Sequence, residues 1–141
     1  MKTSLATAFF LLSMFAQAQQ WHFDLADATK VASSEKKNLL LFFSVADACD
    51  ACRRLDNSVF KSPEFITYAN ANLVLVKLDF QKPESGAQAA ENLRIVEKYN
   101  KDGFFPWVVL IDGNGRVLLK ADLYEEQSPA EYLRKIKDAN G

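Results

Sequence analysis

Two cysteines separated by two residues carry the clearest chemical signal in this sequence. Cys49 and Cys52 enclose Asp50-Ala51, and the chain has no other cysteine. The motif follows the continuously apolar run Leu39–Phe43, so we expect a buried strand followed by a helix that begins at or beside Cys49. At a helix N-terminus, unpaired N–H groups and the helix dipole favour a thiolate, which is the nucleophile in disulfide exchange. We therefore predict that Cys49 attacks a partner's disulfide and that Cys52, one helical turn further on, resolves the mixed disulfide.

Other uses of two closely spaced cysteines have to be weighed against exchange. A zinc site usually has four ligands, and this chain adds only one histidine, His22, so a zinc site is not favoured and we assign no residue as a metal ligand. A structural bridge would close a very small loop, for which the chain-entropy model gives the least stabilisation. Two alternatives stay open. One is a binding module with a static Cys49–Cys52 disulfide, and the other is a carrier that holds Cu(I) on the two sulfurs.

Composition places the chain among ordinary globular proteins. Its 141 residues are 49% hydrophobic and 25% charged, and the formal net charge is -1. A chain of this length forms one domain and buries a core without needing disulfides. The near balance of charge gives no support to nucleic-acid binding or to a membrane-surface role.

The first 18 residues have the layout of a secretory signal peptide. Lys2 precedes the mostly apolar stretch Leu5–Phe15, and Ala16-Gln17-Ala18 is a small-x-small cleavage pattern. The apolar run is too short to span a bilayer comfortably. We therefore expect residues 1–18 to be cleaved, residues 19–141 to form a single domain, and the protein to act in the periplasm or outside a bacterial cell, where disulfides persist.

The remaining pattern predicts alternating helices and strands. Turn and capping signals separate apolar runs throughout the mature chain. We predict a mixed central sheet with helices on both faces, an α/β fold. The first half should contain a short edge strand at Trp21–Phe23, a helix that starts at Asp24 or Asp27 and ends at Lys36-Lys37-Asn38 with cations in its last turn, strand 39–43, a turn at 44–47, and a helix from Cys49 toward Phe60 that restarts at Ser62-Pro63-Glu64. The second half should contain strand 73–80, a loop at 81–86, a helix through Ala89, Leu93 and Val96, strand 107–111, the hairpin turn 112–115 and strand 116–119. The last expected element is a helix that begins with a Ser128–Glu131 capping box and has Tyr132, Leu133 and Ile136 on its buried stripe.

These segments, taken in order, resemble the thioredoxin family and especially the exported thioredoxin-like proteins of bacteria. The resemblance rests on the apolar run before the motif, the cysteine motif, Leu75–Asp79, Gly103–Pro106 and the turn at 112–115. It implies a thioredoxin-like fold and a thiol–disulfide oxidoreductase that acts on exported proteins. It also implies that Pro106 has a cis peptide bond and faces the motif, that the backbone of Phe105 pairs with the client as an added strand, and that Phe104 lies beside the site.

The chain departs from the family around the cysteines. Ala48 stands where a tryptophan is common, and Asp50-Ala51 stand where Gly-Pro is common. Asp47 and Asp50 disfavour ionisation of Cys49, while Arg53 and its neighbour Arg54 favour it. We therefore expect the pKa of the Cys49 thiol to be only modestly lowered.

A second departure lies in the strand before the motif. The family carries a buried acid there, which helps proton transfer at the resolving cysteine, but Phe42 and Phe43 occupy that neighbourhood here. Lys77 matches a lysine that lies near the acid in the family. With that partner gone, we expect Lys77 to face or snorkel to solvent.

The expected partners follow from the motif. They are the thiols and disulfides of client proteins, and a membrane electron donor if the protein works as a reductase. The motif leaves reduction, oxidation and isomerisation open, because direction depends on reduction potential and on the recharging partner. The sequence has no nucleotide or flavin motif, so we expect no cofactor beyond the cysteines. We also expect a monomer without a stable membrane anchor and without nucleic acid.

Overall fold

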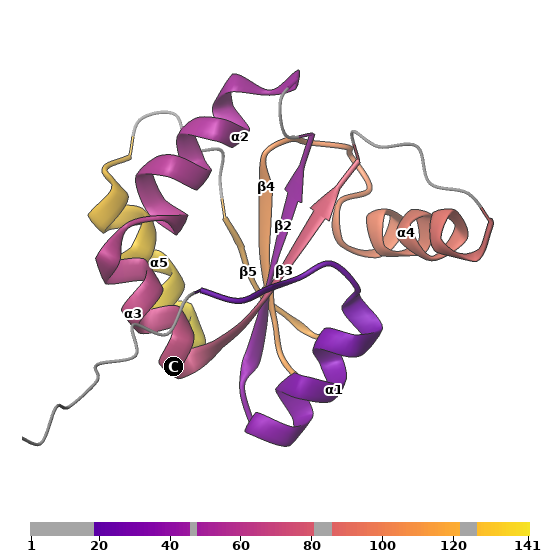
Figure 1. The fold of residues 1–141 in the computed structure, drawn as a ribbon, viewed down its shortest axis with the longest axis horizontal. Coiled ribbons are helices and arrows are strands. Elements are labelled where there is room, and N and C mark those ends of the chain that lie inside the picture. The colour runs from indigo at the N-terminus through magenta and orange to yellow at the C-terminus, as the bar shows by residue number, and fades with distance from the viewer. Residues whose placement is uncertain (1–18, 46–47, 81–85, 122–126) are drawn as a thin grey trace, which may run out of the picture.

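A five-stranded mixed sheet runs through the middle of the molecule (Figure 1). The computed structural model describes residues 19–45, 48–80, 86–121 and 127–141. The predicted leader at 1–18, Asp47 and most of the predicted 81–86 loop therefore lie outside the described residues. The strands have the spatial order β1-β3-β2-β4-β5. They span β1 (Trp21–His22), β2 (Asn38–Ser44), β3 (Leu73–Asp79), β4 (Trp107–Ile111) and β5 (Val117–Ala121).

The strand register brings two distant segments to one end of the sheet. Strand β3 pairs in parallel with β1 and β2, while β4 pairs antiparallel with β2 and β5. Phe43 near the end of β2 lies opposite Trp107 at the start of β4. The cysteine motif, which follows β2, and the segment Phe104–Pro106, which precedes β4, are therefore placed at the same end of the sheet.

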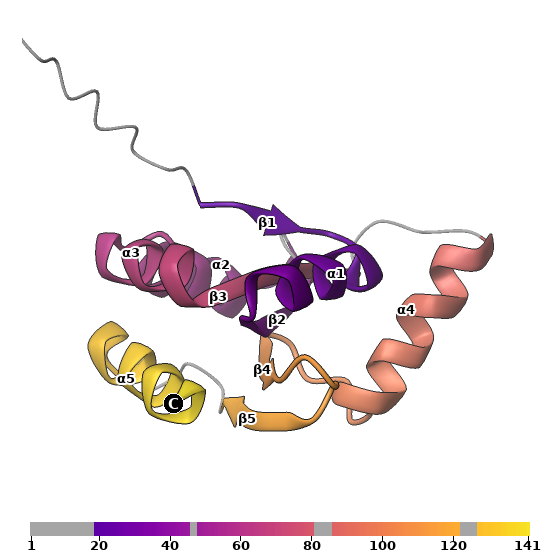
Figure 2. The ribbon, with the colours of Figure 1, turned by 90° about the horizontal axis from the view of Figure 1, so that it is seen from below.

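Helices cover both faces of this sheet, as Figure 2 shows. One face carries α2 (Asp50–Leu55), its π-helical continuation Asp56–Phe60, α3 (Pro63–Asn72) and α5 (Pro129–Asn140). We call it the α2 face. The other, the α1 face, carries α1 (Leu25–Glu35) and α4 (Gly86–Tyr99). Because side chains alternate along a strand, β2 sends Leu40 and Phe42 into the core of the α2 face and Leu39, Leu41 and Phe43 into the core of the α1 face.

The helix starts agree with the capping signals in the sequence. The side chains of Asp24, Ser62 and Ser128 each accept a hydrogen bond from the backbone N–H three residues further on. Such caps satisfy N–H groups that a helix end leaves unpaired. Ser128 and Glu131 complete the predicted capping box, and hydrogen bonds from the Ser128 N–H and hydroxyl hold the pKa of the Glu131 carboxyl below its usual range.

The predicted β-hairpin is also confirmed. The Asp112 carboxylate accepts hydrogen bonds from the backbone N–H groups of Asn114 and Arg116 at 2.9 and 3.0 Å and from the Arg116 guanidinium at 2.8 Å. These bonds, the Arg116 side-chain bond first, hold the pKa of Asp112 below its usual range. The turn therefore sets the pairing of β4 with β5.

One helix prediction needs correction. Helix α1 has no basic residue in its last turn: Lys36 is its C-cap at φ 55°, and Lys37 lies beyond the end, where its Nζ donates to the Asn70 carbonyl at 3.1 Å. On α4, Leu93 is 59% exposed, and the helix is buried through Asn92, Ile95 and Tyr99. Helix α4 is present as predicted, and Val96 packs against the core of the α1 face.

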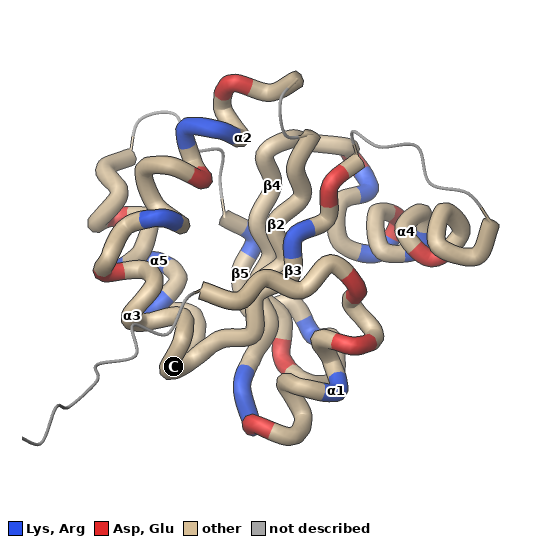
Figure 3. Tube along the Cα trace, in the orientation of Figure 1, with Lys and Arg blue, Asp and Glu red and all other residues tan. Residues whose placement is uncertain are grey.

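The described part of the chain carries charges of both signs on its surface. Figure 3 shows basic and acidic residues interspersed over the helices and strands. Among the described residues, no helix has both the length and the apolar character needed to cross a bilayer.

Candidate active site

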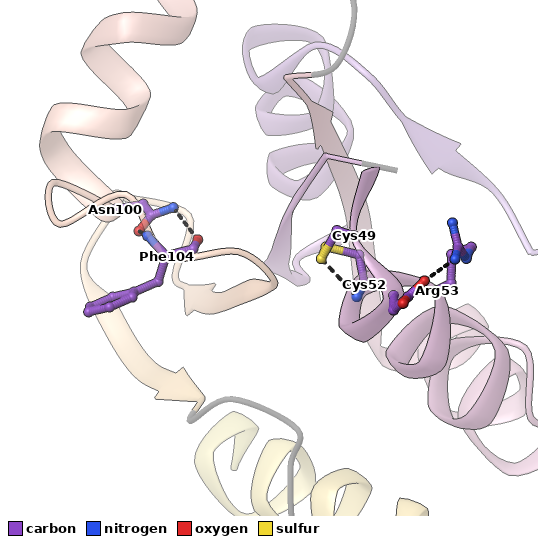
Figure 4. Close-up of a disulfide and its surroundings, with 6 residues drawn as sticks. Cys49, Cys52, Arg53, Asn100 and Phe104 are labelled. Atoms are coloured by element: carbon purple, nitrogen blue, oxygen red, sulfur yellow. Dashed lines mark hydrogen bonds and ion pairs between the residues drawn. A yellow bond between two sulfur atoms is a disulfide. The ribbon is translucent and has the colours of Figure 1, made fainter. Parts of the chain in front are cut away.

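Cys49 and Cys52 form a disulfide at the start of α2 (Figure 4). Cys49 is the N-cap residue, with extended backbone angles of φ -133° and ψ 102°, and α2 begins at the next residue, as predicted. The Cys49 Sγ accepts a hydrogen bond from the Cys52 N–H at 3.1 Å. The sulfur therefore occupies the place where a capping oxygen usually sits, facing N–H groups that favour negative charge.

The two cysteines differ in their access to solvent. Cys49 is partly exposed, whereas Cys52 is only 1% exposed and belongs to the core of the α2 face. A client sulfur in solution can thus approach Cys49 and not Cys52. This asymmetry is what a motif with one attacking and one resolving cysteine requires.

Asp50 and Arg53 form an exposed ion pair beside Cys49, joining positions three apart on α2. The two residues were expected to act on the Cys49 thiolate in opposite directions. Because they pair with each other, the exposed first turn presents little net charge to the sulfur. Asp47, the other acid expected to act on Cys49, lies outside the described residues.

The segment before β4 provides the neighbouring surface. The Phe105–Pro106 peptide bond is cis, Pro106 is buried and Phe105 is half-buried. Cys49 packs against the core of the α2 face, and Phe105 packs against the cores of both faces. Phe104 is 47% exposed, its ring lies 5.7 Å from the Trp107 ring, and Figure 4 shows it directed away from the disulfide.

Asn100 is a positioning residue that sequence reasoning missed. It is only 3% exposed, and its amide brackets the backbone of Phe104. Its Nδ2 donates to the Phe104 carbonyl at 2.9 Å, and its Oδ1 accepts from the Phe104 N–H at 3.0 Å (Figure 4). The available signal was an asparagine between a helix and a Lys-Asp-Gly turn, where such side chains bond to nearby backbone.

The buried side of the motif opens onto a polar cavity that the sequence did not reveal. Its lining includes Cys52, Asp56 and Lys77. The Nζ of Lys77 lies 3.9 Å from Asp56 Oδ2, and the two side chains are 25% and 20% exposed. The strand before the motif lacks the family's acid, as the sequence indicates, but Lys77 does not simply face solvent, because the π-helical turn after α2 supplies another acid, Asp56.

No cluster of three or more His, Cys, Asp or Glu side chains suited to a metal ion is found among the described residues. The two sulfurs are joined to each other in this structure. The arrangement can take two electrons by opening that bond and return them by closing it.

Comparison with known proteins also indicates disulfide chemistry for this chain. A model of the thioredoxin-like domain family matches residues 25–140. The chain is 31% identical over 124 residues to the disulfide bond reductase DsbH of Chlamydia pneumoniae, covering 85% of this chain and 72% of that protein. A solved DsbH oxidoreductase has a TM-score of 0.74 at 31% identity, covering 85% of this chain and 83% of the other. A putative disulphide-isomerase from Bacteroides thetaiotaomicron has a TM-score of 0.63 at 28% identity, covering 88% and 96%. The chain belongs to the thioredoxin-like family and is a thiol–disulfide oxidoreductase with a Cys49-x-x-Cys52 pair.

Proposed function

We propose that the protein is an exported reductase of protein disulfides in which Cys49 attacks the client and Cys52 resolves the mixed disulfide. One observation carries the assignment of roles. Cys49 is partly exposed at the N-cap of α2 and accepts the Cys52 N–H, while Cys52 is 1% exposed. The attacking thiolate is stabilised by the helix end, and the resolving thiol is protected from unrelated disulfides.

The reaction runs in two exchange steps. In the dithiol form, the Cys49 thiolate attacks one sulfur of a client disulfide, and the other client sulfur leaves as a thiolate that takes up a proton. The Cys52 thiolate then attacks Cys49 Sγ, closes the protein disulfide and releases the second client thiol. Two electrons pass from the dithiol to the client disulfide, and a donor must reopen the Cys49–Cys52 bond for the next turnover.

The client is held beside Cys49 by the segment before β4. The backbone of Phe105 pairs with an extended client segment as an added strand, and Pro106 fixes the direction of that backbone. Phe104 extends the apolar surface on the side away from the disulfide. Support for this comes from the strand register, which puts this segment at the same end of the sheet as the motif, and from Asn100, which holds it there.

Reduction is the direction that fits best. The Asp50–Arg53 pair leaves the first turn of α2 nearly neutral, so the Cys49 thiolate is not stabilised to the degree that makes a strong oxidant. A relative 31% identical to this chain is named a disulfide bond reductase. Export rests on the signal-peptide pattern at 1–18, which leaves 19–141 as one domain. Its clients are exported proteins, and a membrane donor recharges it without a further cofactor.

The equilibrium reduction potential of the Cys49–Cys52 pair tests the direction. Thiol trapping across dithiothreitol and glutathione buffers should give a value near that of thioredoxin, about −270 mV. A value near about −120 mV would mark an oxidant and overturn the reductase assignment. The variant with both cysteines changed to Ser is the control, since it should bind clients and transfer no electrons.

A further inference from the structure

The polar cavity described above carries more positive than negative charge. Its volume is about 240 Å³. Three cationic side chains line it, those of Arg53, Lys61 and Lys77, whereas Asp56 supplies the one carboxylate of the lining. Arg53 pairs with the exposed Asp50, which leaves two ammonium groups to share a single carboxylate. The net charge around the cavity is therefore positive, and the cavity attracts anions.

The single carboxylate satisfies these ammonium groups poorly. Lys61 Nζ lies 3.4 Å and Lys77 Nζ 3.9 Å from the same oxygen, Asp56 Oδ2, and both distances exceed the usual length of an N–H···O hydrogen bond. Lys77 Nζ also lies over the Phe42 ring, 5.7 Å from its centroid. Because Lys77 is only 25% exposed, its three N–H donors have limited access to bulk water. An anion that accepts hydrogen bonds from this ammonium group would stabilise it.

The rest of the lining supplies further donors. Lys61 Nζ donates to Asn57 Oδ1 at 3.1 Å, so the amide of Asn57 has its Nδ2 left to donate. Ser44 adds a hydroxyl group and is only 1% exposed. Ammonium, amide and hydroxyl donors around one cavity suit an anion with several oxygen atoms. They suit Ca²⁺ or Mg²⁺ poorly, because such cations need several oxygen ligands and the lining has one carboxylate.

We propose that this cavity binds a small inorganic oxyanion of the phosphate or sulfate class. Lys77 on β3 is its main ligand, and Lys61 and Asn57 contribute from the π-helical turn and its C-terminal end. Asp56 holds the two lysines beside the anion and at the same time repels it, so the affinity is moderate. Binding at this cavity is independent of the direction of electron flow and of which cysteine attacks.

Titration of the oxidised mature protein with inorganic phosphate tests the site. Heteronuclear NMR follows the backbone amides of Ser44, Cys52 and Lys77, and sodium chloride at matched ionic strength is the reference. We expect these amide shifts to saturate with phosphate at a dissociation constant of about 1 mM or below, and to show no saturation with chloride. Sulfate should act like phosphate.

Two substitutions should change the affinity in opposite directions. Lys77→Met should weaken phosphate binding at least about tenfold, because it removes the mostly buried charge and keeps the length of the side chain. Asp56→Asn should instead tighten binding about threefold or more, because it removes a negative charge next to the anion. Lys30→Met is the matched control, since Lys30 also pairs with an aspartate, Asp27 at 3.0 Å, on the exposed side of α1. It should leave phosphate binding unchanged.

A phosphate group could also reach the cavity on a lipid. Ser44 and Cys52 in the lining are each 1% exposed, which favours a small free ion over a headgroup carried at a membrane surface. Vesicles of phosphatidylglycerol are the corresponding probe, and they should leave the amides of Ser44 and Cys52 unchanged. Perturbation of these amides by the vesicles and not by phosphate would assign the cavity to a lipid headgroup and overturn the proposal.

Three further results would contradict it. The first is a wild-type protein whose amide shifts saturate with neither phosphate nor sulfate. The second is weaker phosphate binding in Asp56→Asn. The third is unchanged binding in Lys77→Met or, if that variant fails to fold, in Lys61→Met. The Lys61 side chain is 62% exposed, so its replacement should leave the fold intact, and we expect it to weaken phosphate binding severalfold.

Discussion

The two sulfurs of one disulfide lie in different surroundings. Cys49 is partly exposed, and Asp50 and Arg53, which follow it on the exposed first turn of α2, pair with each other. Cys52 is buried, and the polar cavity that adjoins it is lined by the charged pair Asp56 and Lys77. We call the surroundings of Cys49 the open half of the site and those of Cys52 the buried half; a sulfur of another protein can approach only the open half.

Adjacent phenylalanines on β2 support the two halves separately. Phe42 points into the core of the α2 face, where its ring lies 4.9 Å from that of Phe60, and it lines the cavity beside Cys52. Phe43 points into the core of the α1 face and stacks on Phe80 at 6.1 Å, and Phe80 lies 5.7 Å from Phe105. Because adjacent side chains of a strand point to opposite faces of the sheet, Phe42 supports the surroundings of Cys52 from one core and Phe43 supports those of Phe105 from the other.

Replacing each cysteine separately with Ser should have the largest effect on turnover. Cys49→Ser removes the attacking sulfur, and we expect no detectable turnover and no covalent adduct with a client. Cys52→Ser should also lose turnover, but Cys49 still attacks, so the protein should accumulate as a mixed disulfide. Non-reducing electrophoresis and mass spectrometry of the adduct measure this directly. An adduct formed by Cys49→Ser and not by Cys52→Ser would reverse the two roles.

Replacing Phe42 or Phe43 with Leu should lower the free energy of unfolding by similar amounts but affect different steps of the reaction. Phe42→Leu and Phe43→Leu each lose ring contacts in a fully buried position, so we expect each to lower the free energy of unfolding by about 1–2 kcal/mol. Denaturant unfolding of the oxidised protein measures this. Only Phe42→Leu should slow the step carried out by Cys52, and only Phe43→Leu should raise KM for a peptide client severalfold. Equal effects of both on both steps would show that the two sides are not independent.

Much of the fold follows from local signals in the sequence. The caps at Asp24, Ser62 and Ser128 and the turn at Asp112 are decided by residues within a few positions of one another, and the structure has them as expected. The apolar run Leu39–Phe43 before the motif predicts a strand buried on both faces, and β2 is such a strand. Such features need no knowledge of how the elements pack together.

Features that depend on packing could not be read in the same way. Lys77 and Asp56 come from different elements, and only the docking of α2 and its π-helical continuation onto the sheet brings them together. The family resemblance implies an acid for Lys77 in β2, where Phe42 and Phe43 stand instead. The contact face of α4 depends on packing in the same way: helical spacing predicts the helix, but the sheet decides which of its residues are buried, and Leu93 is 59% exposed.

Removing the exposed acid beside Cys49 should have the smallest effect. Asp50→Asn deletes a negative charge and releases Arg53 from its ion pair, so the Cys49 thiolate gains stability. Because exposed pairs of this kind contribute little, we expect the alkylation rate of Cys49 by iodoacetamide at neutral pH to rise only about two- to threefold.

The increase should shrink at high ionic strength, since the charges involved are open to solvent. Glu91→Gln is a matched control: Glu91 pairs with Arg94 at the same i,i+3 spacing on α4, away from the motif, and should leave the rate unchanged. A slower reaction in Asp50→Asn would mean that Arg53 helps Cys49 only while Asp50 holds it in place. The reactivity of Cys49 would then depend on a fixed arrangement of these two charges.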